Sequence, residues 1–361
     1  MNIHMKHSDI GNWFRPQTGF SIVEILVALV LSLILTLVVS QIYLSSKQSY
    51  HLQEAQSRLQ ENGRFALELL AKDIRRAGNL GCPSAKIAPV VIAKDSPDIS
   101  TATAISGFNA TTEISKYPIP TSTYSGQNWQ PKVTSDTLDA VKGTDIFNIQ
   151  FAEPCGGWLQ EKITGMTSSP SIKIPSTNTC SIEANTELVL SDCGQIEVFR
   201  AAAAPSSGTT MTLTESTYNS RENFTYSHDM DAEVMEFHSY TYFIRMFNAE
   251  PTLYRQENKS TITTPTPQPV MEGVEDMQVL YGIDNDADGS VDQYLAPTET
   301  ITVPWAKVIA VRFDLVLRSI GAEGENLTLT TTKKACNGKD VTDRRLRRCY
   351  SFTVNIRNPR T

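Results

Sequence analysis

The chain has 361 residues, which is long enough for one large or two modest domains. It carries 32 Lys and Arg against 39 Asp and Glu, and this net charge of −7 argues against a protein built mainly around nucleic acid. Hydrophobic residues make up only 40% of the sequence, yet every residue from Ile25 to Ser46 is uncharged. The apolar content is therefore concentrated near the N-terminus.

The uncharged run predicts a membrane-spanning helix. Its 22 residues make roughly 33 Å of helix, enough to cross a hydrocarbon core of about 30 Å. The preceding residues carry Lys6 and Arg15 against Asp9, which favours a cytoplasmic N-terminus. The run continues into helix-forming sequence without a secretory cleavage site, so we expect it to be retained.

Glu24 stands at the start of this run, where a carboxylate needs a partner because burying its charge in lipid is costly. The segment Gly19–Glu24 reads Gly-Phe-Ser-Ile-Val-Glu. Followed by a long apolar run, it resembles the class III leader of type IV pilins and type II secretion pseudopilins. The resemblance implies that prepilin peptidase cuts between Gly19 and Phe20, removing a leader of residues 1–19, and methylates Phe20.

The resemblance also gives Glu24 a role. It implies that Glu24 neutralises the N-terminal amine of Phe20 in a neighbouring subunit and so sets the register of assembly. The alternative is a plain signal-anchor in which Glu24 lies at the headgroup level.

The helix is expected to continue past the membrane. We assign residues 20–46 to a transmembrane and assembly helix and residues 47–78 to an amphipathic helix that continues into a head domain. Gly78 is placed to end it, and the lone Gly63 is either a flexible point or, as we prefer, one weak residue. Apolar residues recur at helical spacing at Leu52, Ala55, Leu59, Ala66, Leu70, Ile74 and Ala77.

Residues 79–361 read as a β-rich head with polar loops. Residues 98–135 are rich in Ser, Thr and Pro and predict a surface insertion, and 201–221 and 256–269 predict loops. The whole pattern predicts an α+β, pilin-like fold, in which a long N-terminal helix packs on an antiparallel sheet. The predicted strands are Asp145–Phe151, Leu188–Leu190, Ile196–Phe199, Phe237–Met246, Met277–Ile283, Val308–Leu317 and Tyr350–Ile356.

Five short segments resemble PilW-type minor pilins: Asn62–Ala66, Asp73–Gly78, Gly81-Cys82, Gly143–Asp145 and Thr353–Asn358. The resemblance implies a non-enzymatic subunit for initiation or tip assembly of the type IV pilus, and hence for piliation, twitching motility and adhesion. Implied partners are other minor and major pilins, prepilin peptidase, and the inner membrane with its pilus assembly platform. The implied location is the bacterial inner membrane, with a single pass and a periplasmic head, and then the pilus.

Two rival functions remain. A type II secretion minor pseudopilin shares the leader. A DNA-binding or adhesive module at the pilus tip is the alternative of another class.

An acidic segment, Asp284–Asp292, has the spacing of a calcium loop. Carboxylates stand at positions 1, 3, 5 and 9, with Gly289 at position 6 for a sharp turn. We therefore expect a Ca²⁺ site in a β-hairpin, although position 12 is Leu295 and not the Glu of an EF-hand. A solvated hairpin tip is the alternative. The expected ligands are Asp284, Asp286, Asp288, the carbonyl of Ser290, and Asp292 directly or through water.

Six cysteines, an even number without a Cys-x-x-Cys pair, favour disulfides formed in an oxidising compartment. Proximity in sequence suggests Cys180 with Cys193 and Cys336 with Cys349, which leaves Cys82 with Cys155. Six cysteines allow 15 pairings, so this assignment rests on proximity alone.

A basic stretch lies between Cys336 and Cys349. It could contact DNA phosphates. Because only Tyr350 offers a nearby aromatic ring and two Asp residues dilute the charge, we favour a solvated loop or a docking surface for an acidic subunit. Its basic residues are Lys339, Arg344, Arg345, Arg347 and Arg348, just after Lys333 and Lys334.

His228 and His238 flank an acidic segment and invite comparison with a zinc hydrolase. A catalytic zinc usually has three protein ligands, and no His-Glu-x-x-His spacing is present. We therefore favour a surface loop that leads into a strand. No nucleophile elbow, Walker loop or dinucleotide fingerprint occurs either, so the sequence gives no support to an enzyme.

Overall fold

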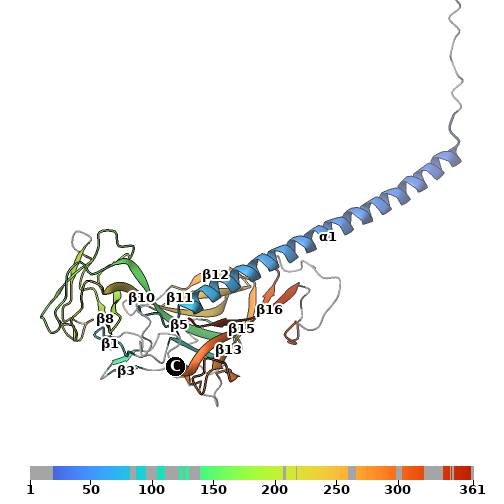
Figure 1. Ribbon diagram of the computed structural model, residues 1–361. Helices are drawn as coiled ribbons and strands as arrows, with labels where there is room; N and C mark the ends of the chain where they lie inside the picture. Colours follow the sequence, from blue (N-terminus) through green and yellow to red (C-terminus); the bar gives the residue numbers. More distant parts are fainter. Residues whose placement is uncertain are drawn as a thin grey trace, which may run out of the picture. The chain divides into compact units, whose positions relative to one another are not determined.

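The computed structural model describes residues 19–81, 87–94, 104–109, 122–124, 127–129, 139–205, 209–216, 218–258, 266–297, 303–320, 336–341, 343 and 345–358. The chain divides into two compact units, Met1–Glu54 and Ala55–Thr361. The long helix α1 (Ile22–Arg76) runs through both, and the strands follow it in the second unit (Figure 1).

The described strands range from two residues in β1 to 15 in β10. A single turn of 3-10 helix, η2 (Trp305–Lys307), precedes β15. Their bounds are β1 (Val90–Val91), β2 (Ile105–Asn109), β3 (Ser122–Tyr124), β4 (Gln127–Trp129), β5 (Asp145–Trp158), β6 (Ser171–Lys173), β7 (Glu187–Asp192), β8 (Gln195–Arg200), β9 (Thr210–Thr212), β10 (Glu233–Phe247), β11 (Glu250–Glu257), β12 (Gln268–Glu272), β13 (Val274–Ile283), β14 (Gln293–Leu295), β15 (Val308–Arg318) and β16 (Arg347–Asn355).

Within the first unit, α1 exposes its apolar side chains. Every described residue from Gly19 to Tyr50 is exposed. The most apolar window of α1 has a mean hydropathy of 3.0, and none of that window is buried. This part of α1 is long and apolar enough to cross a membrane, as the sequence predicts.

Within the second unit, the remainder of α1 is amphipathic. Its buried positions are three or four residues apart and so form one stripe. Gly78 has a φ of +75°, the left-handed conformation typical of a glycine that ends a helix, and Arg75 and Arg76 lie in the last turn. The predicted continuation of the helix and its end are therefore confirmed to within two residues. The buried stripe consists of Leu59, Gly63, Ala66, Leu70, Asp73 and Ile74.

Two sheets make most of the head. The first has eight strands in the order β1-β8-β7-β10-β11-β12, with β5 paired to both β10 and β2. The second is a four-stranded antiparallel sheet in the order β14-β13-β15-β16. The β1–β8 pair is parallel, unlike the other pairs of the eight-stranded sheet. Helix plus largely antiparallel sheet is the α+β fold that the sequence predicts.

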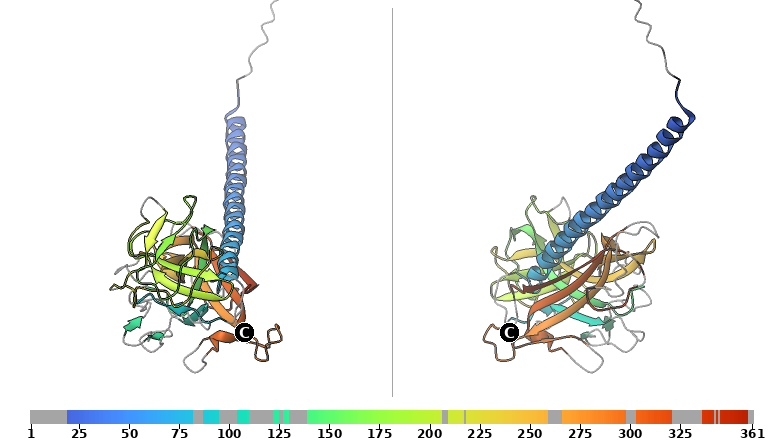
Figure 2. Two further views of the ribbon diagram at one scale, coloured as in Figure 1. Left: turned by 60° about the vertical axis from the view of Figure 1, so that its left-hand side comes forward. Right: turned by 90° about the vertical axis from the view of Figure 1, so that its right-hand side faces the viewer.

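The main core lies where the helix meets both sheets (Figure 2). Leu70 and Ile74 of α1 share it with Phe147 and Tyr242 of the eight-stranded sheet and with Phe313 of β15. The Phe147 ring stacks on Tyr242 at 4.9 Å and meets Phe313 edge-on at 5.0 Å. These aromatic contacts join the two sheets beneath the helix.

A second core fills what we call the side lobe, built from described residues between 155 and 234. Its buried side chains include Ile172, Leu188, Phe199 and Phe224. The Phe199 and Phe224 rings meet edge-on at 5.2 Å. The lobe contains the β7–β8 hairpin and the small β6–β9 sheet.

Two of the three predicted disulfides are wrong. Cys155 bonds to Cys180, with 4.9 Å between their Cα atoms, and Cys193 is disulfide-bonded elsewhere. The backbone N–H of Thr179 donates to Cys155 O, so a loop returns beside β5 in a way that spacing does not reveal. Cys336 bonds to Cys349 as predicted. Cys82, assigned to Cys155 from the sequence, lies outside the described residues.

The sequence analysis did not predict several of the strands. The supposed surface insertion at 98–135 contains β2, which pairs with β5 and buries Ile105. The supposed loop at 201–221 contains β9, and β12 begins inside the supposed loop at 256–269. Strands β2 and β9 are short and pair with β5 and β6, which are distant in the sequence, so their own alternation of residues is a weak signal.

Candidate functional site

The predicted processing site lies just before α1. Gly19 and Phe20 are exposed and precede the first helical residue, Ile22. Ser21 caps the helix: its Oγ accepts a 3.3 Å hydrogen bond from the N–H of Val23. The Gly19–Phe20 bond therefore lies in exposed, non-helical chain, where a protease can reach it.

Glu24 lies in the first turn of α1. There its negative charge interacts favourably with the positive end of the helix dipole. Ser21 and Glu24 also have the sequence spacing of a capping box. The interaction with the helix dipole acts within one subunit, whereas the predicted contact with Phe20 acts between subunits.

The acidic loop Asp284–Asp292 connects β13 to β14, and Ile283 pairs with Gln293 where the strands meet. The predicted hairpin is therefore present. Asp284 organises the loop, because its two carboxylate oxygens accept from the N–H groups of Ala287 at 2.7 Å and Gly289 at 2.9 Å. Asp292 Oδ2 accepts from the N–H of Asn285 at 2.7 Å and closes the loop from its other end.

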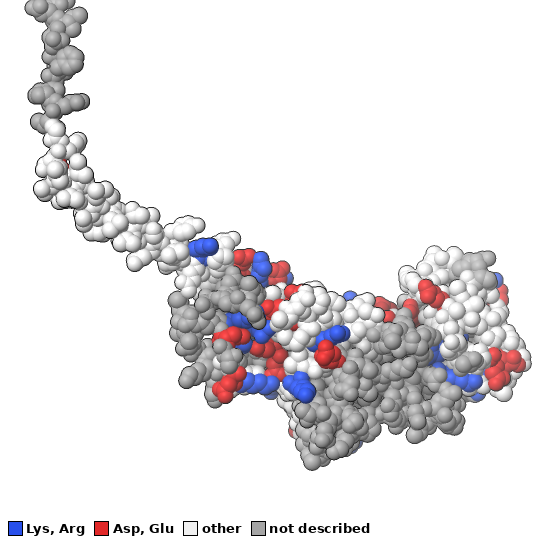
Figure 3. Space-filling view, turned by 180° about the vertical axis from the view of Figure 1, so that it is seen from behind, with Lys and Arg blue, Asp and Glu red and all other residues white. Residues whose placement is uncertain are grey.

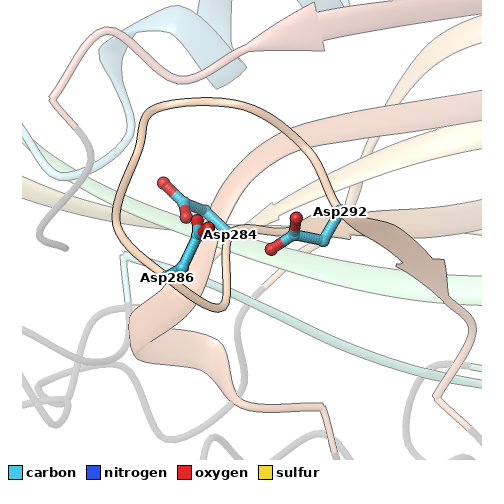
Figure 4. A group of neighbouring side chains, drawn as sticks. All are labelled: Asp284, Asp286 and Asp292. Atoms are coloured by element: carbon cyan, nitrogen blue, oxygen red, sulfur yellow. The ribbon is translucent and has the colours of Figure 1, made fainter.

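The loop brings three of the predicted calcium ligands together. Asp284 and Asp286 lie next to each other, and Asp292 points toward them from across the loop (Figure 4). Asp288 is not part of this group; its Oδ1 accepts from the N–H of Ser290 at 2.7 Å. Asp284 is buried, while Asp286 and Asp292 are exposed.

The geometry of these carboxylates fits a divalent cation. Because an oxygen ligand lies about 2.4 Å from Ca²⁺, two ligands of one ion are at most about 4.8 Å apart. One ligand atom from each of Asp284, Asp286 and Asp292 lies within 4.8 Å of the other two. Burial by itself raises the pKa of Asp284, but the N–H groups of Gly289, Ala287 and Asp288 outweigh it and lower that pKa, so the carboxylate is charged.

One cation near this loop was not anticipated from the sequence. Lys307, in η2, donates from Nζ to Asn285 O at 2.9 Å, and its own carbonyl accepts from the N–H of Asp284 at 3.0 Å. Lys307 thus anchors the start of the loop through backbone groups. Its ammonium group donates to a backbone carbonyl and not to the three carboxylates.

The basic stretch is largely neutralised by carboxylates of the head. Arg345 Nη1 lies 2.6 and 2.7 Å from the two carboxylate oxygens of Glu250, and Arg347 binds both oxygens of Glu275 at 2.6 and 2.8 Å. Lys339 Nζ lies 2.6 Å from Asp276. Lys333, Lys334 and Arg344 lie outside the described residues.

Arg348 is the remaining described cation of the predicted set, and it lies over the Tyr350 ring, 5.5 Å from the centroid. On the face shown in Figure 3, acidic and basic side chains are intermixed and do not form a stripe of one sign. This pattern favours the docking or solvated loop over the DNA interpretation.

The two histidines do not meet at a zinc site. His228 contacts Asp192 and Glu197, whereas His238 contacts Glu257. The one group of metal-ligating side chains found among the described residues is the acidic loop. The prediction of a surface loop is wrong for His228, because its side chain is fully buried.

Comparisons with known proteins match both ends of the chain. Residues 14–40 match the prokaryotic N-terminal methylation motif, which includes Gly19, Phe20 and Glu24. Residues 241–358 match PilW, the type IV pilus-assembly protein W. Both matches are to parts of a PilW-like type IV pilin. The PilW match spans the end of β10, strands β11 to β16, the acidic loop and the Cys336–Cys349 disulfide.

The chain was also compared with solved structures and with curated proteins. A solved structure, the type IV-like pilin TTHA1219 from Thermus thermophilus, is 18% identical, covers 49% of this chain and 86% of its own, and has a TM-score of 0.21. No curated protein sequence matches the chain. The side lobe, from Cys155 to Val234, lies outside both family matches.

Proposed function

We propose that this pilus-related pilin is a minor pilin, a structural subunit for initiation or tip assembly of the type IV pilus. The observation that carries the proposal is that the two parts of one helix differ in polarity and burial. Its first part is exposed and apolar behind a processing motif, and its second part is built into a head that matches PilW. A subunit of this design stays in the membrane before assembly and packs its apolar helix among others afterwards.

The proposed location follows from charge and redox chemistry. Positive charge in residues 1–19 favours a cytoplasmic start, so the head lies in the periplasm and then in the pilus. Disulfides at Cys155–Cys180 and Cys336–Cys349 suit that oxidising compartment. The proposed partners are other minor and major pilins, the assembly platform, and prepilin peptidase acting at Gly19–Phe20.

Deletion of the gene tests the proposal against its nearest rival. We expect fewer surface pili by electron microscopy and lost twitching, with both restored by the intact gene. Protein secretion should be unchanged. Normal piliation and twitching together with defective secretion would identify a type II secretion pseudopilin, and steep salt-sensitive DNA binding would support the tip module.

We also propose that the acidic loop binds Ca²⁺. Asp284, Asp286 and Asp292 supply the carboxylates, and Asp288 and the carbonyl of Ser290 complete the set after a small adjustment of the loop. Support comes from the spacing of the three carboxylates, since close negative charges repel one another unless a cation compensates them.

Isothermal titration of the purified chain with CaCl₂ tests this proposal. We expect Asp286→Asn to weaken binding by roughly tenfold or more, because ligand charge sets affinity in such loops. Asp314→Asn removes a half-buried carboxylate of β15 outside the loop and should leave binding unchanged. No calcium heat and no change of melting temperature on adding EDTA would exclude the site.

A further inference from the structure

His228 lies at the centre of a buried charged cluster in the side lobe. Its side chain is 0% exposed. Its Nδ1 lies 3.0 Å from Asp192 Oδ2, and its Nε2 lies 3.0 Å from Glu197 Oε2. Asp192 ends β7 and Glu197 belongs to β8, so the ring contacts a carboxylate from each strand of the β7–β8 hairpin.

The two carboxylates offer the ring hydrogen-bond acceptors on both sides. A neutral imidazole has one N–H donor and one nitrogen lone pair, whereas an imidazolium has two N–H donors. Because ionised carboxylates only accept, the imidazolium alone can donate to Asp192 and Glu197 at the same time. A neutral ring would turn a lone pair toward one carboxylate in a site sheltered from water, which is unfavourable.

Glu197 is kept ionised by several donors. The N–H groups of Thr225 and Tyr226 donate to its two oxygens at 2.7 and 3.1 Å. Burial by itself raises the pKa of Glu197, but His228 and these two N–H groups outweigh burial and lower that pKa. Arg221 adds a positive charge 3.8 Å from the same carboxylate.

The other described neighbours of the ring are an aromatic ring and groups that already have partners of their own. Asp192 Oδ1 accepts from the N–H of Gly194 at 2.8 Å, and the Asp192 side chain is 17% exposed. The Phe224 ring packs edge-on against the imidazole at 5.8 Å. Asp229, the next residue in the chain, pairs with Lys162 at 3.2 Å. With an imidazolium, the cluster of two carboxylates, Arg221 and His228 is electrically neutral.

The ring also joins two pieces of the fold. We call residues 221–230 the ribbon. On one side the ribbon pairs with residues 163–166, where Ile163 and His228 exchange two backbone hydrogen bonds of 2.9 Å. On the other side, its polar attachments to the β7–β8 hairpin include the Glu197 contacts and both ring contacts of His228.

We propose that His228 is a pH-dependent latch: its doubly protonated ring ties the ribbon to the β7–β8 hairpin, and loss of one ring proton as the pH rises loosens the ribbon. The direction follows from the donors, because the second hydrogen bond exists only while the ring carries both protons. The ribbon and its neighbour carry exposed apolar side chains, with Tyr226 41%, Met230 57% and Met166 66% exposed. The latch therefore controls the shape of an apolar surface of the side lobe.

The protonation state can be read directly from the rings. In the full chain, held in detergent micelles and labelled with nitrogen-15 at histidine, we expect both ring nitrogens of His228 to carry protons at about pH 7. A lone-pair nitrogen signal should appear only at higher pH. A neutral His228 ring at about pH 6 would overturn the proposal.

Hydrogen exchange measures the consequence in the ribbon. After correction for the intrinsic effect of pH, we expect amides of residues 224–228 to exchange roughly ten- to a hundredfold faster at about pH 10 than at about pH 6. The side chain in His228→Gln has no imidazole ring, so it cannot donate to Asp192 and Glu197 as the doubly protonated ring does. The ribbon amides of this variant should therefore exchange fast at both pH values. His238→Gln is the matched control, because His238 contacts the single carboxylate of Glu257 and should leave the ribbon unchanged.

A second variant keeps the test sharp if His228→Gln does not fold. Glu197→Gln presents an amide that can either donate or accept, so a neutral ring is tolerated and the dependence on pH should disappear. If the corrected hydrogen-exchange rates of the ribbon amides did not depend on pH in the wild type, the latch would be contradicted. The same rise with pH in Glu197→Gln as in the wild type would contradict it too.

Discussion

Asp145 is a buried carboxylate that connects the two large sheets. Its Oδ2 accepts a 2.7 Å hydrogen bond from the N–H of Val279, which joins β5 to β13. Asp145 is 3% exposed, and its Oδ1 has no hydrogen-bond partner among the residues that the structure describes. Burial raises the pKa of Asp145 to about 7, since the opposing effect of the Val279 N–H is smaller.

This pKa predicts that the head loses stability as the pH rises. Between the ordinary value of 3.8 and about 7, the unfolded chain is ionised at Asp145 while the folded chain holds the proton, so the free energy of unfolding falls. Above about pH 7 both states are ionised and the loss is complete. The side chain in Asp145→Asn keeps a carbonyl oxygen that can accept from the Val279 N–H. Because the amide does not titrate, this substitution should remove the loss in the free energy of unfolding, which is up to about 4 kcal/mol.

Urea unfolding at several pH values between about 4 and 8 measures the effect of Asp145→Asn. Asp314→Asn, at a side chain that is 41% exposed, should keep the dependence of the wild type on pH. An Asp145→Asn profile with the full wild-type slope would show that another group is responsible.

Gly63 is the one glycine of α1, and the structure gives it a purpose other than flexibility. A Cβ at this position would collide with the Tyr350 ring of β16. The Tyr350 hydroxyl also donates to Leu59 O at 3.0 Å, one helical turn earlier. The glycine therefore lets the helix approach β16 closely, which neither reading of Gly63 from the sequence included.

We expect Gly63→Ala to destabilise the head by about 1 kcal/mol. The steric cost of about 1–3 kcal/mol exceeds the gain of about 1 kcal/mol in helix propensity. In a Tyr350→Ala background the collision is gone, so the same change should stabilise the protein. Equal effects of Gly63→Ala in the two backgrounds, measured by urea unfolding, would rule out the contact.

At the scale of elements, the two described disulfides stabilise different parts of the head. Cys155–Cys180 closes 25 residues within the side lobe, and Cys336–Cys349 closes 13 residues beside β16. Chain entropy predicts a loss of about 3.5 kcal/mol for Cys155→Ser with Cys180→Ser and about 3 kcal/mol for Cys336→Ser with Cys349→Ser. Denaturant unfolding measures both losses, and a non-reduced peptide joining Cys180 to Cys193 would contradict the pairing.

The elements also show which sequence signals are reliable. Strands β13, β15 and β16 overlap their predicted ranges because they are long and alternate clearly. The acidic loop was predicted because turn residues and strand ends are local features, and Gly289 has the expected positive φ of +86°. Strands β2 and β9 were missed because only pairing with β5 and β6 holds them in place.

At the scale of the whole molecule, assembly should depend on one charge near the start of α1. If Glu24 pairs with a neighbour's N-terminal amine away from water, Glu24→Ala leaves that amine unpaired. We expect the amount of this chain in sheared pili to fall by about tenfold or more, with cleavage of residues 1–19 unchanged. Glu61→Ala, an exposed glutamate on the same helix, is the control. Normal incorporation of Glu24→Ala, measured by immunoblot, would contradict this role.

The sequence by itself determined the features that depend on near neighbours. These are the apolar helix with its processing motif, its amphipathic continuation to Gly78, the hairpin at Asp284–Asp292 and the general α+β class. Each follows from periodicity, capping or turn chemistry within a few residues.

Tertiary structure alone decided which distant groups meet. It pairs Cys155 with Cys180 across 25 residues, His228 with Glu197 across 31, and Asp145 with Val279 across 134. No spacing rule specifies such contacts, because they arise where sheets and loops pack together. Burial then changes the chemistry of the groups: it raises the pKa of Asp145, and it encloses the His228 ring between two carboxylates.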